Sequence, residues 1–194
     1  MQNNVCQIID SSGSLPREVI AARGICEVPF YYKFGNPDYF RENMDSSTDS
    51  FYQHLKDAPE DLPHTSAPNI YDWVNALEER YSGGARDFVL TTISSKLSAS
   101  YQTASSAKQM FEDRHDDVRL AVVNSNTCAC GQGALELAIS AMVCAGKPFE
   151  SIVAAIDTMK GKTASLFAVH SLKYMRAGGR IGGATAFIGG LINV

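Results

Sequence analysis

Apolar residues recur along the chain in two patterns, short runs and longer stretches with helical spacing. The short runs and alternations predict strands over residues 5–9, 26–32, 87–93, 120–123 and 165–169. Helical spacing predicts helices near 51–55, over 70–81, from just beyond residue 93 to about 114, over 134–144 and over 148–160. Strands that alternate with helices are typical of βαβ units and a parallel sheet. The pattern therefore predicts an α/β protein whose N-terminal domain is a three-layer α/β/α sandwich.

Small polar residues follow three of the predicted strands at the point where each strand ends. They are Asp10-Ser11, the segment 92–94 and Asn124-Ser125. The carboxyl ends of parallel strands share one edge of the sheet, and ligands of this fold class bind at that edge. The sequence therefore predicts a binding site there. Asp10 is expected either to orient groups at this site or simply to form the turn after its strand.

The segment 90–104 carries a dense cluster of hydroxyls between a predicted strand and a predicted helix. A helix N-terminus offers unpaired N–H groups, and with the hydroxyls of Ser94 and Ser95 it suits a carboxylate or a phosphate. The alternative is that Ser94 or Ser95 only caps the helix.

Thr65-Ser66 is a second hydroxyl-rich entry to a helix. Ser66 is the expected N-cap, Pro68 lies in the first turn, and Gly83-Gly84 ends the helix. Trp73 is expected to pack into the core. His64, beside Thr65, is a further candidate to line the site, although the sequence favours a surface or core role for it.

The pattern changes from residue 164 onward. Residues 172–180 read as a turn of helix and a glycine hinge, and residues 181–194 are small, apolar and rich in glycine. We place a domain boundary near 160–163, with residues 1–161 forming the domain of the ligand head-group site. Residues 162–194 then form the beginning of a second α/β domain, because so short a segment does not fold alone.

Composition excludes several classes of function. The hydrophobic fraction of 45% and charged fraction of 20% fit an ordinary globular protein, and the net charge of −4 provides no basic field for nucleic acid or an anionic membrane. No apolar run has the length of a membrane span, and the N-terminus lacks a signal-peptide pattern. The five cysteines have no disulfide-framework spacing, which favours a reduced, cytoplasmic protein.

Common catalytic and metal-binding motifs fail on inspection. Gly161-Lys162-Thr163 resembles the end of a phosphate-binding loop, but Ile156 stands where that loop needs glycine. Gly131-x-Gly133-x-x-Glu136 lacks the third glycine of the dinucleotide fingerprint. Cys128-x-Cys130 has no second ligand pair, and the four histidines show no zinc spacing. No nucleophile with its base, no metal and no cofactor is predicted, so we do not expect a self-contained enzyme.

Four ordered motifs resemble those of a known family. Thr65-Ser66-Ala67-Pro68 is similar to its Thr-Ser-x-Pro element, and residues 92–104 resemble its signature "iSSxLSGTyqsA". Residues 172–182 resemble its "LxyLrxGGRIs" element, and residues 5–11 resemble its opening strand and Asp-Ser turn. These motifs span nearly the whole chain, and the family is DegV, the bacterial fatty-acid-binding proteins.

The resemblance implies two α/β domains with an acyl chain buried between them. It implies a carrier that presents a long-chain fatty acid to a separate fatty acid kinase, which phosphorylates the carboxylate. By position in the motifs, the carboxylate would be held by Thr65, Ser66, Ser94 and Ser95. Arg180 is the candidate for a head-group contact or for partner docking and phosphoryl transfer, and Asp10 is a second candidate contact.

The chain departs from the family pattern in three places. Ala99-Ser100 replaces the Gly-Thr of the signature, which keeps a hydroxyl but removes a flexible residue, and Asn69 replaces a usual serine. The chain ends at Asn193-Val194, whereas the family continues for most of another domain with a histidine near the carboxylate and much of the acyl pocket wall. A truncated chain is therefore expected. Two other functions stay open: an enzyme acting on a small carboxylated or phosphorylated metabolite at the same anion site, and a non-binding remnant or assembly subunit.

Overall fold

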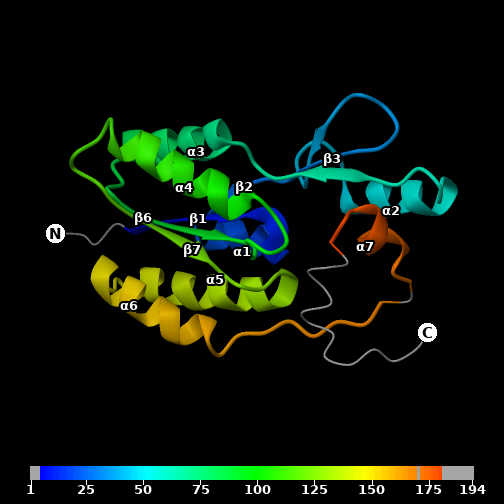
Figure 1. Cartoon of the computed structure of the whole chain (residues 1–194). Coiled ribbons are helices and arrows are strands. Elements are labelled where there is room, and N and C mark those ends of the chain that lie inside the picture. The colour runs from blue at the N-terminus through cyan, green and yellow to red at the C-terminus, as the bar shows by residue number, and fades with distance from the viewer. Residues whose placement is uncertain (1–4, 170, 181–194) are drawn as a thin grey trace. The chain divides into compact units, whose positions relative to one another are not determined.

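The computed structural model describes residues 5–169 and 171–180 (Figure 1). His170 and the glycine-rich segment 181–194, about which the sequence made predictions, lie outside the described residues. The described chain forms two compact units: one from the residues up to Phe30 together with Ala67–Ser165, and one from Tyr31–Ser66 together with the segment that starts at Leu166. No helix within the described ranges is long and apolar enough to cross a membrane.

The first unit is built on a four-stranded sheet in which all neighbours are parallel. Its strands are β1 (Val5–Asp10), β2 (Cys26–Val28), β6 (Asp87–Thr92) and β7 (Arg119–Asn124), in the order β2-β1-β6-β7. Every residue of β6 is buried, as expected of an inner strand with both faces covered. The register pairs Ile9 with Thr91 and Thr92 with Asn124, so the carboxyl ends of these strands meet at one edge.

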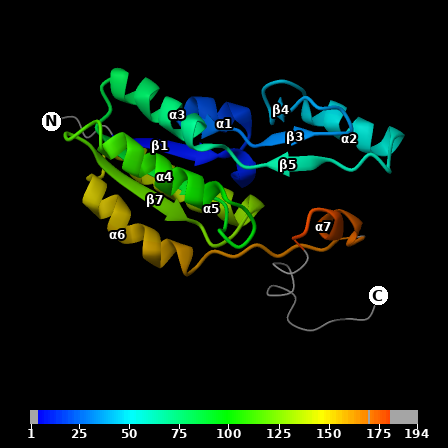
Figure 2. The same ribbon diagram turned by 45° about the horizontal axis from the view of Figure 1, so that its top comes forward.

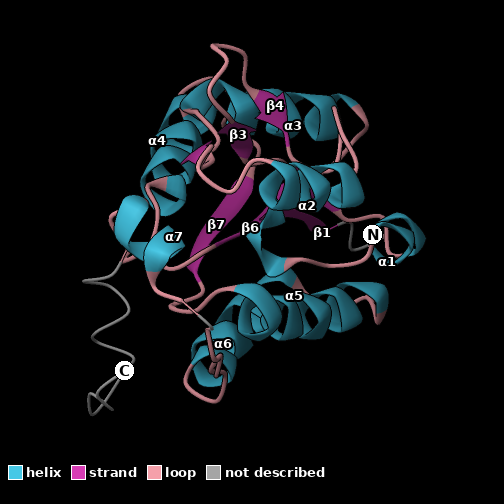
Figure 3. Cartoon of the chain, turned by 90° about the vertical axis from the view of Figure 1, so that its right-hand side faces the viewer, coloured by secondary structure: helices cyan, strands magenta, loops and turns pink. Residues whose placement is uncertain are grey.

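Helices cover both faces of this sheet (Figures 1 and 3). On one face, α3 (Ile70–Ser82) and α4 (Ser100–Glu112) bury Trp73 and Phe111 against Ile8 and Phe88. On the other face, α5 (Ala129–Cys144) and α6 (Phe149–Lys160) pack Ile139 against Val89. A short 3-10 turn, η1 (Ser11–Gly13), follows β1 and leads to α1 (Arg17–Ala22). The predicted three-layer α/β/α fold and the core position of Trp73 are confirmed.

Two helices begin at residues other than those predicted. α4 begins at Ser100, so residues 93–99 form a loop between it and β6. α5 begins at Ala129, ahead of the predicted start at residue 134, and contains Gly133. A Cβ at Gly133 would stand 2.7 Å from the carbonyl oxygen of Gly13, so the glycine allows the helix to approach η1 closely.

The start of α3 also corrects the sequence analysis. Asn69, not Ser66, is the N-cap: its Oδ1 accepts bonds from the N–H groups of Tyr71 and Asp72, and the Asp72 side chain accepts from the Asn69 N–H. Pro68 disfavours a helical conformation at Ala67, which excludes a helix that starts at Ser66. The asparagine that stands in place of the signature's usual serine is therefore a helix cap, a role for which serine is also well suited.

We expect Asn69→Ala to lower the free energy of unfolding by about 1 kcal/mol, because it removes the side-chain half of a capping box. Asn69→Ser should lose much less, since serine is also a strong N-cap. Urea unfolding of the two variants beside the wild type measures both values. Equal losses for alanine and serine would show that the box contributes nothing.

The second unit holds a small antiparallel sheet with strand order β4-β3-β5 (Figure 2). The strands are β3 (Tyr31–Lys33), β4 (Phe40–Arg41) and β5 (His64–Ser66), and the helices are α2 (Thr48–Asp57) and α7 (Lys173–Ala177). The predicted helix near 51–55 and the helical turn within 172–180 are confirmed.

Two predicted strands are wrong. The segment 26–32 forms two strands in different sheets, β2 and β3, because Pro29 lacks an N–H for a continuous ladder. Residues 165–169 form no strand: the Ser165 hydroxyl bonds to Thr127 and the backbone of Cys128, and Leu166 is almost fully exposed. The compact first unit extends to Ser165 but excludes Tyr31–Ser66. The division into domains 1–161 and 162–194 stays a prediction.

Candidate functional site

The loops at the carboxyl edge of the parallel sheet are tied to one another. The Ser125 N–H donates to the Thr92 carbonyl at 3.1 Å, and the Ser94 N–H donates to the Thr127 carbonyl at 2.9 Å. Backbone hydrogen bonds therefore join the loop 93–99 after β6 to the loop 125–128 after β7. This is the edge at which the sequence predicted three polar strand exits to meet.

Ser94 and Ser95 lie in the loop 93–99 and not in the first turn of α4. Ser94 is only 2% exposed, and its Oγ accepts the Lys96 N–H at 3.3 Å. Ser95 is exposed, and its Oγ accepts the Asn124 side-chain amide at 2.8 Å. A hydroxyl that accepts a hydrogen bond still carries a hydrogen to donate, so each of the two serines keeps one donor for a further acceptor.

The alternative that Ser94 or Ser95 caps the helix is wrong, because α4 begins at Ser100. The expectation that these serines add to a helix N-terminus is wrong for the same reason. The Leu97 and Ser98 N–H groups bond to the Ser94 carbonyl instead, which closes a turn inside the loop. The carboxylate-binding role of the two serines does not depend on a helix start and stays a prediction.

Asp10 lies inside the edge and is 0% exposed. One carboxylate oxygen, Oδ1, accepts from Gln132 Nε2 at 2.7 Å and from the backbone N–H and hydroxyl of Ser12. The other, Oδ2, accepts from the Ile93 N–H at 2.9 Å and the Ser100 hydroxyl at 2.6 Å. A direct contact between Asp10 and a head group stays a prediction, while the observed bonds connect β1 to η1, the loop 93–99, α4 and α5.

Gln132 and Glu136, two buried polar residues of α5, extend this network, and the sequence analysis did not assign them to the site. Gln132 Nε2 donates to Glu136 Oε1 at 2.8 Å as well as to Asp10, and Gln132 Oε1 accepts the Ser12 hydroxyl at 2.8 Å. Burial raises the pKa of Glu136 well above its ordinary value; the nearby charges of Asp10 and Glu27 add to the rise, and the Gln132 hydrogen bond opposes it. The signal in the sequence was a pair of polar residues four apart in a helix that is otherwise apolar.

Thr65 and Ser66 are exposed residues of β5 in the second unit. Thr65 lies opposite Tyr32, and Ser66 lies opposite Tyr31. Successive side chains of a strand point to opposite faces, so the two hydroxyls point to opposite faces of the small sheet, and Thr65 shares a face with Tyr32. Their expected grip on the same carboxylate as Ser94 and Ser95 stays a prediction. So does the candidate role of His64, which lies opposite Lys33.

Arg180 follows the short helix α7 and is exposed. Its guanidinium donates to the Gly178 carbonyl, and Gly179 between them has a φ of +74°, a conformation that favours glycine. The turn at Gly178-Gly179 thus brings the Arg180 guanidinium within hydrogen-bond distance of the backbone two residues before it. The candidate role of Arg180 in head-group contact or partner docking stays a prediction.

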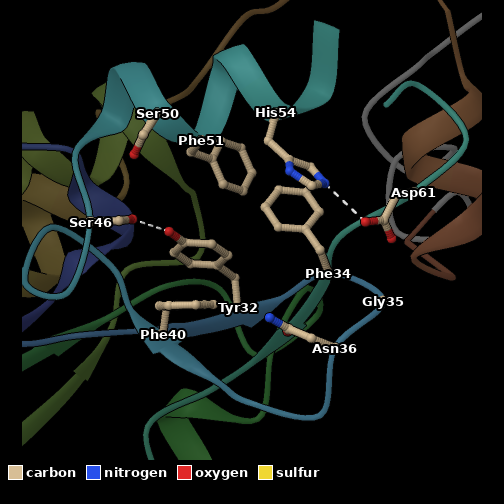
Figure 4. Close-up of a pocket in the computed structure, with 10 residues that line it drawn as sticks. All are labelled: Tyr32, Phe34, Gly35, Asn36, Phe40, Ser46, Ser50, Phe51, His54 and Asp61. Atoms are coloured by element: carbon tan, nitrogen blue, oxygen red, sulfur yellow. Dashed lines mark hydrogen bonds and ion pairs between the residues drawn. The ribbon is translucent and has the colours of Figure 1, made fainter. Parts of the chain in front are cut away.

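The second unit contains an aromatic pocket of about 330 Å³, which the sequence analysis missed (Figure 4). The Tyr32 ring stacks on Phe40 with centroids 5.6 Å apart, and the Phe34 ring lies 3.8 Å from that of His54. His54 Nε2 and Asp61 Oδ2 pair at 2.9 Å at its rim. The aromatic residues between 30 and 52 were the available signal in the sequence.

Comparison with known proteins places this arrangement in a family. A family model described as an uncharacterised protein family, DegV, matches residues 6–194. A DegV domain-containing protein of Clostridium perfringens is 30% identical over 189 residues, which cover 96% of this chain and 65% of that protein. Another, from Clostridium acetobutylicum, is 31% identical and is covered to 64%. The chain therefore spans slightly less than two thirds of these relatives.

Solved structures give the same result for the fold. A stearic-acid-binding protein from Eubacterium ventriosum matches with a TM-score of 0.81 and 28% identity, over 95% of this chain and 63% of that one. DegV from Bacillus subtilis, described as a fatty-acid-binding protein, matches with a TM-score of 0.80 and 27% identity, over 98% of this chain and 66% of that one.

Proposed function

The chain belongs to the DegV family, and we propose that it is a fatty-acid carrier, not an enzyme. In this proposal the carboxylate of a long-chain fatty acid is held by the hydroxyls of Ser94 and Ser95. The observation that carries the proposal is the hydrogen bonding of these serines at the carboxyl edge, where each hydroxyl oxygen accepts a bond and keeps its own hydrogen for a further acceptor. Fatty-acid binding by the Eubacterium ventriosum and Bacillus subtilis proteins supports the choice of anion.

The energetics of this site divide between head and tail. Two serine hydroxyls supply charge-assisted hydrogen bonds to a carboxylate without any metal. They also fix its orientation, while burial of the acyl chain contributes about 0.8 kcal/mol for each CH₂ removed from water. In the full proposal Thr65, Ser66 and Arg180 complete the head-group site, the protein resides in the cytoplasm, and a separate fatty acid kinase phosphorylates the presented carboxylate.

Solvent extraction of the purified protein followed by mass spectrometry tests the proposal directly. We expect co-purified fatty acid, and binding of added palmitate or oleate by protein that has been stripped of lipid. An extract without fatty acid, together with no binding of either probe, would contradict the proposal. Turnover of a carboxylated or phosphorylated metabolite in the absence of any kinase would favour the enzyme alternative.

Ser94→Ala should weaken oleate binding by about tenfold, because it removes a hydrogen bond to a charged group. The melting temperature should change little, since Ser94 does not cap α4. Isothermal titration and thermal unfolding of the same preparation separate the two effects. An unchanged oleate affinity would remove Ser94 from the site.

A further inference from the structure

The loop 93–99 that carries Ser94 and Ser95 is held at both ends by one carboxylate. Oδ2 of Asp10 accepts the Ile93 N–H at 2.9 Å, directly before Ser94. The same oxygen accepts the Ser100 hydroxyl at 2.6 Å, at the first residue of α4. A short loop with its two ends bound to a single buried atom has few conformations open to it.

The opposite oxygen of Asp10 is bound to a part of the unit that is itself fixed. Oδ1 accepts from Gln132 in α5 and from Ser12 in η1, and Gln132 also bonds to Ser12 and Glu136. These bonds lie inside the unit, where the low local dielectric strengthens a hydrogen bond. Through Asp10, the two ends of the loop are therefore fixed relative to the packed helix α5.

We propose that Asp10 is a positioning residue of the carboxylate site, which sets the orientation of Ser94 through the Ile93 N–H and the Ser100 hydroxyl without touching the ligand. The proposal rests on the proposed function for its ligand. It replaces the direct head-group contact expected for Asp10 with an action through the loop. Thr127 and Asn124 hold the middle of the same loop from the side of β7, through the Ser94 N–H and the side chain and N–H of Ser95.

The departure from the family signature at Ala99-Ser100 fits this role. Ala99 has a φ of −77°, a conformation that any residue adopts, so the position does not need glycine. Ser100 is 0% exposed and keeps the hydroxyl that the signature's threonine also carries. The hydroxyl that is kept at this position is the group that donates to Asp10.

Four variants test the proposal by oleate affinity: Ser100→Ala, Ser100→Thr, Ser94→Ala and the double variant Ser94→Ala with Ser100→Ala. We expect Ser100→Ala to weaken oleate binding by about tenfold, and Ser100→Thr, which keeps the hydroxyl, to bind oleate as the wild type does. If the hydroxyl acts through Ser94, the double variant binds no more weakly than Ser94→Ala alone. Losses that add would overturn the proposal. Ser105→Ala is the matched control, because that hydroxyl of α4 bonds only to the carbonyl of Tyr101 among the described contacts.

Amide hydrogen exchange in the unliganded protein provides a second, independent measurement. Ser100→Ala and Asp10→Asn should accelerate exchange at residues 94–98, with no change in α6, because the loop ends are released while the core stays packed. If the wild type binds no fatty acid, the proposed function fails, and exchange still decides the positioning role. Unchanged exchange in the loop for both folded variants would overturn it.

Discussion

Gly13→Ala is expected to lower the free energy of unfolding by about 3 kcal/mol, the upper part of the usual range for an overpacked core. A Cβ at Gly13 would stand 2.0 Å from Oε2 of Glu136 and 2.7 Å from its carboxyl carbon. The Glu136 side chain is fully buried and its other oxygen is held by Gln132, so it has little room to move aside. Urea unfolding of the variant measures the loss.

Relief of the clash identifies its cause. Glu136→Ala removes the carboxyl group, so the Gly13→Ala substitution should cost much less in that background, with a coupling energy of about 1–3 kcal/mol. Gly161→Ala is the matched control, because a Cβ there meets atoms only at 3.7 Å, an ordinary contact distance. A similar cost of Gly13→Ala in both backgrounds would show that Glu136 is not what excludes a side chain at position 13.

The layers of the first unit and the polar carboxyl edge of its sheet could be predicted because they depend on local patterns. The apolar run of β6 indicates an inner strand that is buried on both faces. The helical spacing of apolar residues in α3 and α4 indicates which face of each helix is buried. Polar residues at three strand ends indicated the edge, and parallel pairing then brings those ends together.

The start of α4 could not be predicted from local residues, because its first residue is held by a hydrogen bond to Asp10, which is distant in the sequence. Four of the residues between Ile93 and Thr103 are serines, and each is a plausible cap by type. Ser100 becomes the first helical residue while its hydroxyl bonds to a carboxylate from a distant strand. The same reason explains Gln132 and Glu136: their partners, Asp10, Ser12 and each other, are assembled only by the fold.

The segments that were predicted wrongly lie where tertiary contacts replace a local preference. Residues 165–169 have the composition of a strand, yet Ser165 bonds to the start of α5 and no described strand lies beside the segment. Residues 26–32 alternate as one strand should, but Pro29 interrupts the ladder, and the chain passes from one sheet to the other.

Glu136 should make the stability of the protein depend on pH in a direction opposite to that of most carboxyl groups. Its pKa is higher in the folded state than in the unfolded chain, because burial disfavours the charged form. Between those two pKa values the folded protein binds more protons, so the free energy of unfolding falls as pH rises through that window. The contribution is fully present below the unfolded pKa of about 4.3 and is lost by at most about 1.4 kcal/mol per pH unit above it.

Glu136→Gln isolates this effect, because glutamine keeps the shape and the acceptor for Gln132 but does not ionise. Urea unfolding of both proteins at intervals from about pH 4 to pH 8 gives a difference in stability, in which the titration of groups common to the two proteins largely cancels. We expect the variant to gain on the wild type as pH rises, and the exposed substitution Ser151→Ala to show no such trend. A constant difference across this range would mean that Glu136 is already ionised in the fold. In that case an ionised Glu136 would need a donor at Oε2, where the described residues place none.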